Sequence, residues 1–278
     1  MSAVETGYWA PAVGVLPPPV PAHRSSRSPL SWVVVFGLLL FVVVMAAGFA
    51  DRQVHANAVG EVFVITTDAP AAAGWGPSYV DDRGRPARWD PCRPISFVVQ
   101  AGWIPQQGRA DLAVALRRLS AASGLQFVDE GDTDELPSQG RASYQPDRYG
   151  DRWAPLLVGW VPGQGTDLGL GNGVQGLSVA VAVPGPDGAS LVSGQVALDA
   201  THRLASGFGP GTTDGEVLLH ELAHAVGLGH VLDATQVMYP QTTNAESVFG
   251  AGDRAGLAAV GAAAGCHPAP KARPLQLG

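Results

Sequence analysis

The longest apolar segment of the chain lies near its N-terminus. Residues 30–50 read LSWVVVFGLLLFVVVMAAGFA, a run of 21 residues without a charged side chain. At about 1.5 Å per residue, a helix of this length crosses a hydrocarbon core of about 30 Å. A buried helix of a soluble protein would show a polar face, and this segment has none. The pattern therefore predicts one transmembrane helix at residues 30–50.

Arginines next to this segment predict its orientation. Arg24 and Arg27 precede it, and an excess of positive charge marks the cytoplasmic side of a membrane helix. We therefore expect a cytoplasmic N-terminus and an extracytoplasmic domain after residue 50. Cleavage as a secretory signal is the alternative, because Gly48 and Ala50 offer a small-residue cleavage site, and the protein would then be secreted.

Composition divides the rest of the chain into four parts. Residues 1–29 are rich in proline and predict a cytoplasmic tail without a core. Residues 51–87 predict an extracytoplasmic stalk, and residues 268–278 a flexible tail. Residues 88–267 remain as one globular domain.

Hydrophobic positions in this domain follow the helix period in some segments and form short strand-like runs in others. Residues 111–123 carry apolar side chains at helical spacing and predict an amphipathic helix; further helices are indicated at 215–229 and near the end of the domain. Five apolar runs bounded by Gly and Pro predict strands at Ile95–Gln100, 125–130, Leu156–Val161, 177–183 and 195–199. We expect an α+β fold, in which helices pack on a mixed sheet of five strands.

The overall composition excludes several classes of protein. Hydrophobic residues make up 46% of the 278 residues and charged residues 15%, which excludes a disordered chain. The net charge of -7 argues against nucleic acid as a partner. Two cysteines are too few for a small disulfide scaffold. Composition gives no indication of the oligomeric state.

Residues 215–230, GEVLLHELAHAVGLGH, contain the candidate catalytic chemistry. His220 and His224 are four residues apart, so both imidazoles project from one face of a helix and can bind one metal ion. Gly227 can adopt the left-handed conformation that ends a helix, and the turn would return His230 as a third ligand. Three histidines leave one tetrahedral position open, which is typical of catalytic zinc. Glu221 lies at the flank of that position, where a general base is needed.

The pattern HELAHAVGLGH at residues 220–230, followed by VMYP at 237–240, resembles the metzincin zinc metallopeptidases. The second motif is most similar to the Met-turn of the matrixin branch, here in a membrane-anchored bacterial type. The resemblance is specific over residues 217–240 and extends over about 88–265. It implies a twisted, mixed, five-stranded sheet with an active-site helix and a C-terminal helix.

The resemblance also implies roles for individual residues. His220, His224 and His230 would bind one zinc ion, and Glu221 would be the catalytic base. Met238 would form the hydrophobic floor beneath the metal without binding it.

The same resemblance implies how a substrate binds. Tyr239 and Pro240 would wall the pocket for the substrate side chain that follows the scissile bond. Substrates of this family lie extended along an edge strand, for which residues 177–183 are the candidate, although an ordinary core strand fits their composition equally well. Asp253 takes the place of an acidic residue near the start of the family's C-terminal helix, and a role as N-cap is sufficient to explain it.

Other family features are missing from the sequence. No PRCGxPD-like segment precedes the domain, and His202 lacks companions for a second, structural zinc. Asp167 and Asp199 could contribute to a calcium site, as the family often has, with solvated or capping roles as the alternative.

Together these patterns predict a zinc-dependent endopeptidase that hydrolyses extracytoplasmic proteins through metal-activated water. The alternative is a non-catalytic surface module in which zinc only holds the fold and the protein binds a peptide or a cell-wall partner. Glu221 favours the enzyme, because a purely structural zinc site has no use for a base.

Cys92 and Cys266 flank almost the whole domain. In an oxidising compartment we expect them to form a disulfide. The alternative is that Cys92 acts as an inhibitory zinc ligand.

Overall fold

The computed structural model describes residues 62–64, 74–163, 166–171, 173–202, 204–243 and 247–273, all within one compact unit. The expected proline-rich tail and the expected transmembrane helix at residues 30–50 lie outside these ranges. Within the described ranges, no helix is both long enough and apolar enough to cross a membrane.

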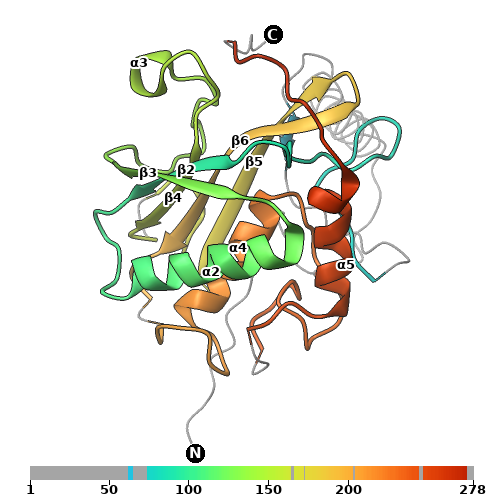
Figure 1. The fold of residues 1–278 in the computed structure, drawn as a ribbon. Coiled ribbons are helices and arrows are strands. Elements are labelled where there is room, and N and C mark those ends of the chain that lie inside the picture. Colours follow the sequence, from blue (N-terminus) through green and yellow to red (C-terminus); the bar gives the residue numbers. More distant parts are fainter. Residues whose placement is uncertain are drawn as a thin grey trace, which may run out of the picture. The chain divides into compact units, whose positions relative to one another are not determined.

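A mixed sheet forms the centre of this unit (Figure 1). Its strands are β1 (Val62–Val64), β2 (Ile95–Gln100), β3 (Phe127–Thr133), β4 (Leu156–Val161), β5 (Gly176–Gly185) and β6 (Gly188–Asp199). They lie in the order β1-β5-β6-β4-β2-β3. The pairs β6-β4, β4-β2 and β2-β3 are parallel, whereas β5 is antiparallel to both β6 and β1.

The prediction of an α+β fold with a mixed sheet is confirmed, and all five predicted strands are present, with β1 as an addition. The strand β6 begins at Gly188, seven residues before the predicted start at 195. Small residues such as Ser190, Ser193 and Gly194 interrupt the apolar run there, yet all of β6 is buried. β3 extends to Thr133 as an edge strand with mostly exposed or half-buried side chains, so its polar end shows no apolar pattern.

Helices α2 (Gly108–Ser123), α4 (Asp214–Ala225) and α5 (Ala251–Val260) lie on one side of the sheet, and the short helix α3 (Pro146–Tyr149) lies on the other (Figure 1). A single turn of 3-10 helix, Ala262–Ala264, follows α5. The predicted apolar face of α2 is buried, with Leu112, Ala115, Leu116 and Leu119 in the core. Hydrophobic burial of this face, together with that of α4, holds the helices on the sheet.

The folded unit begins earlier than residue 88. Ser78 N donates a hydrogen bond to Gly227 O (2.8 Å), and Gly229 N donates one to Gly76 O (2.7 Å). Trp75 packs against the core. The expectation of a stalk over residues 51–87 is therefore wrong for residues 74–87. Backbone hydrogen bonds to a distant loop hold this segment, and such bonds leave no periodic pattern in the sequence.

Cys92 and Cys266 form a disulfide, with their Cα atoms 5.4 Å apart. The bond joins the residues before β2 to the chain that follows α5. Because both sulfur atoms are bonded to each other, Cys92 offers no thiolate to a metal here.

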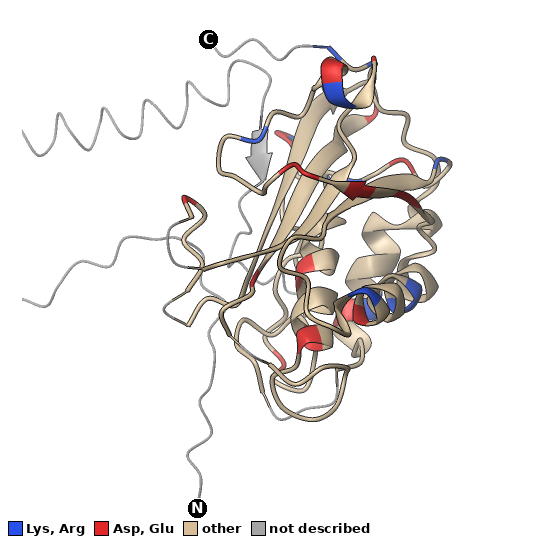
Figure 2. Ribbon diagram, turned by 90° about the vertical axis from the view of Figure 1, so that its left-hand side faces the viewer, with Lys and Arg blue, Asp and Glu red and all other residues tan. Residues whose placement is uncertain are grey.

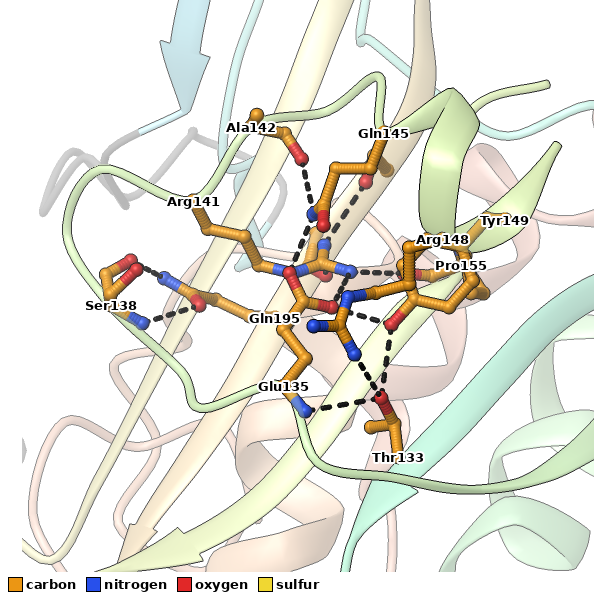
Figure 3. Close-up of polar contacts among 12 residues, drawn as sticks. Thr133, Glu135, Ser138, Arg141, Ala142, Gln145, Arg148, Tyr149, Pro155 and Gln195 are labelled. Atoms are coloured by element: carbon orange, nitrogen blue, oxygen red, sulfur yellow. Dashed lines mark hydrogen bonds and ion pairs between the residues drawn. The ribbon is translucent and has the colours of Figure 1, made fainter. Parts of the chain in front are cut away.

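A buried ion pair fixes the connection between β3 and β4 to the sheet (Figure 3). Arg141 donates two hydrogen bonds of 3.0 Å to the carboxylate of Glu135 and one of 2.8 Å to Gly194 O in β6. Gln195 of β6 exchanges two further hydrogen bonds with the backbone of Ser138. The long connection is thus held by polar contacts against the side of the sheet that α2, α4 and α5 leave uncovered.

Candidate metal centre

Helix α4 supplies two of the three candidate metal ligands. It begins after Thr213, whose hydroxyl group accepts a hydrogen bond from Glu216 N and so caps the helix. Every residue of α4 is buried. His220 and His224 are 0% and 5% exposed, so both imidazoles project into the protein rather than into solvent.

A turn at Gly227 brings His230, the third candidate ligand, back to the two helical histidines. Gly227 follows α4 with φ of +103°, and its backbone N donates to His224 O (2.9 Å). A side chain at this position would be strained by the positive φ, and its Cβ would lie 2.9 Å from Ala87 O. The chain then reverses and places His230, 7% exposed, against the two helical histidines.

The three imidazoles lie close enough to share one ion. Each offers a ring nitrogen, and these nitrogen atoms lie within 4.8 Å of one another. The Nε2 atoms of His224 and His230 are 3.2 Å apart. Two ligands of a tetrahedral zinc ion at 2.0–2.1 Å are separated by about 3.3 Å. The arrangement predicted for His220, His224 and His230 can therefore hold a metal ion.

Backbone carbonyl groups orient two of these rings. His220 Nδ1 donates to Val237 O and His224 Nδ1 donates to Leu228 O, each at 2.7 Å. Carbonyl oxygens only accept hydrogen bonds, so the proton of each ring is on Nδ1. This tautomer leaves the lone pair of Nε2 available to a metal ion.

Burial keeps the helical imidazoles neutral. It lowers the pKa of His220 to about 3, with a smaller contribution from His230, and it lowers the pKa of His224 well below 6.5. Neutral imidazole is the form that binds metal. A set of three neutral histidine nitrogens fits zinc better than calcium or magnesium, which prefer oxygen ligands.

Glu221 lies beside this group of imidazoles and against the start of β5. It is 3% exposed, and burial raises the pKa of its carboxyl group to about 8. A Cβ at Gly176 would lie 2.7 Å from Glu221 Cγ, so the glycine lets the helix approach the strand. A cation held by the imidazoles would favour the ionised carboxylate and lower this pKa.

A hydrogen bond joins the predicted Met-turn, residues 237–240, to His220. Met238 is fully buried, and its carbonyl group accepts a hydrogen bond from Val231 N (2.8 Å). Val237, the residue before it, holds the ring of His220. Tyr239 and Pro240 are half-buried at the end of the turn.

Asp253 has a wider role than the N-cap expected from the sequence. The N-cap of α5 is Gly250, and Asp253 is the third residue of the helix. Its carboxylate accepts hydrogen bonds from Gly250 N (2.9 Å), Val237 N (3.0 Å) and Met238 N (3.4 Å). This fully buried side chain therefore joins α5 to the Met-turn.

Ser78 is a site residue that the sequence pattern did not indicate. Its hydroxyl group donates to Leu228 O (2.8 Å), the same carbonyl oxygen that accepts from His224 Nδ1. A serine in a proline- and glycine-rich segment resembles any loop residue, so only the folded structure reveals this contact.

The candidate calcium residues have other partners. Asp199 Oδ1 accepts hydrogen bonds from Gly163 N (2.9 Å) and Thr201 Oγ1 (2.6 Å), and its Oδ2 lies 3.0 Å from His202 Nδ1. Asp167 Oδ2 accepts a hydrogen bond from Gln139 N (3.2 Å). In the described part of the chain, neither aspartate belongs to a group of three potential metal ligands.

Comparison with known proteins gives no match: no protein-family model and no curated protein matches this chain.

Proposed function

We propose that the protein is a zinc-dependent endopeptidase that hydrolyses peptide bonds of extracytoplasmic proteins. The observation that carries this proposal is a group of three buried imidazoles beside a buried carboxyl group, that of Glu221. A zinc ion bound there would supply Lewis-acid activation of a peptide carbonyl group and of water. The resemblance of residues 220–240 to the metzincins supports the same assignment.

The side chains around the centre have separate roles in this proposal. Glu221 accepts the proton of the attacking water and transfers it to the leaving amine, as a general base and then a general acid. His220 and His224 keep a fixed orientation because Val237 O and Leu228 O hold their Nδ1 protons. Burial of the site excludes bulk water and strengthens each charge interaction within it.

Strand β5 offers a place for an extended substrate. Its outer edge pairs with β1 at residues 180–182, and no described strand pairs with that edge over residues 176–179. The unpaired part begins at Gly176, which lies against Glu221. A peptide that adds to this edge by backbone hydrogen bonds would place a peptide bond near the imidazoles.

The disulfide supports an extracytoplasmic location. A bond between Cys92 and Cys266 forms and persists in an oxidising compartment. Residues 30–50 would anchor the domain to the cytoplasmic membrane, as the sequence pattern predicts.

Two variants of the full-length protein test the proposal. Glu221→Gln should keep one zinc ion per chain and lower the rate of peptide cleavage by about 10²–10⁴-fold, because it removes only the base. His224→Ala should lose both zinc and activity, because it removes a ligand. Elemental mass spectrometry measures the zinc, and mass spectrometry of a digested peptide library measures cleavage.

The same experiment distinguishes the proposed endopeptidase from the alternative, a non-catalytic surface module. Wild-type protein that binds zinc stoichiometrically but cleaves no peptide would favour the non-catalytic alternative. Cleavage by Glu221→Gln at the wild-type rate would show that this carboxylate is not the base. Removal of zinc by a chelator should abolish cleavage, and added zinc should restore it.

A further inference from the structure

The two sides of the sheet differ in how they resist the addition of a further strand. β3, at one edge, carries the acidic residues Asp129, Glu130 and Asp132 (Figure 2). Charged side chains on an edge strand discourage pairing with another strand. β5 carries no charged residue between Gly176 and Gly185, and β1 covers part of its outer edge instead. The outer edge of β5 is therefore suited to strand addition, and β1 already occupies part of it.

β1 lies on the same edge to which we propose that a substrate adds. It pairs with residues 180–182 of β5 in an antiparallel ladder. Gly176, where β5 lies against Glu221, is about 13 Å along the strand from this ladder. On that edge, only residues 176–179 of β5 have no described strand beside them. An extended substrate that pairs with more of β5 must therefore take the place of β1.

β1 is held weakly enough to exchange with another strand. It is three residues long, and each backbone hydrogen bond adds little net free energy, because water replaces the bond when the strand leaves. Residues 65–73 tether β1 to the segment in which Ser78 N donates to Gly227 O. A strand on a tether of this length competes at an effective concentration on the order of 1 mM. A peptide that binds the edge therefore has to compete with β1.

We propose that β1 is an autoinhibitory strand, which competes with the substrate for the outer edge of β5. This inference rests on the proposed peptidase function and adds the regulation of its site. While β1 is paired, a substrate has only residues 176–179 of that edge to pair with. When β1 leaves, residues 180–182 become available as well, and the substrate gains the backbone hydrogen bonds that β1 gives up.

Binding of a peptide with the sequence of β1 tests this competition without requiring turnover. The probe is a fluorescent peptide of residues 60–66, GEVFVIT, and fluorescence anisotropy measures its affinity for the full-length, zinc-loaded Glu221→Gln protein. The test variant adds Phe63→Pro and Val64→Pro. Neighbouring residues of a strand direct their N–H groups to opposite edges, so one of the two prolines removes a donor that faces β5. We expect this variant to bind the probe at least about tenfold more tightly, because the edge of the parent protein is free in about a tenth of the molecules or fewer.

The matched control changes the same two positions of β1 without breaking the strand. Phe63→Tyr with Val64→Ile keeps both N–H donors and places strand-forming side chains at both positions. This variant should bind the probe as weakly as the parent protein does. Equal affinities of the proline variant and its parent would overturn the inference, and so would weaker binding by the proline variant. Thermal unfolding of both variants near the temperature of the parent protein would show that the change is confined to the edge of the sheet.

Hydrogen exchange tests the same competition without any substitution in β1. The Glu221→Gln protein is saturated with the probe, and mass spectrometry of chain fragments longer than the probe measures deuterium uptake. Displacement of β1 should raise uptake at residues 62–64 and lower it at residues 176–179, because the probe takes the place of the strand. Lowered uptake at residues 176–179 with unchanged uptake at residues 62–64 would show that β1 is a fixed end of the edge, and the inference would be wrong.

Cleavage by proteins that retain Glu221 distinguishes the two proposals. If both hold, the proline variant of β1 should lower KM for the peptides that the wild type cuts by about tenfold and leave kcat unchanged. If the proline variant binds the probe more tightly but no protein cuts a peptide, the peptidase function fails and the competition remains. If peptides are cut with the same KM by the wild type and by the proline variant, only the competition fails.

Discussion

The carbonyl oxygen of Leu228 accepts two hydrogen bonds, one from His224 Nδ1 and one from Ser78 Oγ. The backbone of the same segment adds Ser78 N to Gly227 O. Two loops that are 150 residues apart in the chain thus meet behind one candidate metal ligand, His224. Groups that orient a ligand through its second nitrogen set both the direction of its lone pair and its basicity.

Ser78→Ala should weaken zinc binding by about tenfold, because Leu228 O loses the donor that helps to hold it in place for His224. Competition with a chromophoric chelator measures the affinity. The matched control is Ser120→Ala. Ser120 lies in α2, and its Oγ also donates to a backbone carbonyl group, that of Leu125, which holds none of the three histidines. Equal zinc affinities of the two variants would show that Ser78 does not position the ligand.

At the scale of elements, the ion pair of Glu135 and Arg141 holds the connection between β3 and β4 in place against the sheet. The two side chains are 10% and 5% exposed. Burial raises the pKa of Glu135, but the hydrogen bond and charge of Arg141, with further bonds from Tyr149 and Gln145, outweigh it and leave the pKa below 4.5. The carboxylate is therefore ionised in the folded protein and depends on Arg141 for compensation.

Arg141→Met should lower the free energy of unfolding by about 3 kcal/mol, because it leaves a buried carboxylate without its partner. Urea denaturation followed by circular dichroism measures the change. Arg152→Met is the control, since its ion pair with Glu130 is partly exposed and should contribute less than about 1 kcal/mol. Adding Glu135→Gln to Arg141→Met should recover part of the loss. A loss no larger than that of the control would mean that other contacts, such as the hydrogen bonds between Gln195 and the backbone of Ser138, are sufficient to hold the connection.

The same elements show how far the sequence alone can predict this fold. The strands β2 and β4 follow from short apolar runs, and the helix α4 follows from apolar positions at helical spacing. The spacing of His220 and His224 places both on one face of that helix, and Gly227 indicates the turn that brings His230 back to them. The pairing of Glu135 with Arg141 could not be predicted, because two charges in a polar loop look alike whether exposed or buried. Nor could the link from Asp253 to the Met-turn, since an acidic residue near a helix start is explained equally well by capping.

At the scale of the whole molecule, the disulfide closes the fold over most of its length. It joins Cys92 to Cys266 across 174 residues. On the chain-entropy model, closing a loop of this size stabilises a protein by about 5 kcal/mol. The candidate metal centre lies within this loop, so the positions of His220, His224 and His230 are held by the closed chain as well as by the core.

Asp214, a buried acidic residue in the first turn of α4, gives the stability of the whole fold a pH dependence. Asp214 is 8% exposed, and burial, with the nearby charge of Asp111, raises its pKa from 3.8 to about 6. Between these values the folded protein keeps a proton that the unfolded chain releases. The contribution of Asp214 to stability therefore falls as the pH rises from 3.8 through 6, and the loss of this contribution is complete above that range.

Asp214→Asn should accordingly raise the free energy of unfolding by about 1–2 kcal/mol at pH 7.5 and change it little at pH 4. The gain is smaller than the full pKa shift implies, because the N-terminus of α4 favours a negative charge at this position. Urea denaturation of wild type and variant at the two pH values measures the difference. Equal gains in the free energy of unfolding at both pH values would mean that the substitution acts through packing rather than through the proton. A loss at pH 7.5 would mean that the interaction of the carboxylate with the helix N-terminus outweighs its burial and its repulsion by Asp111.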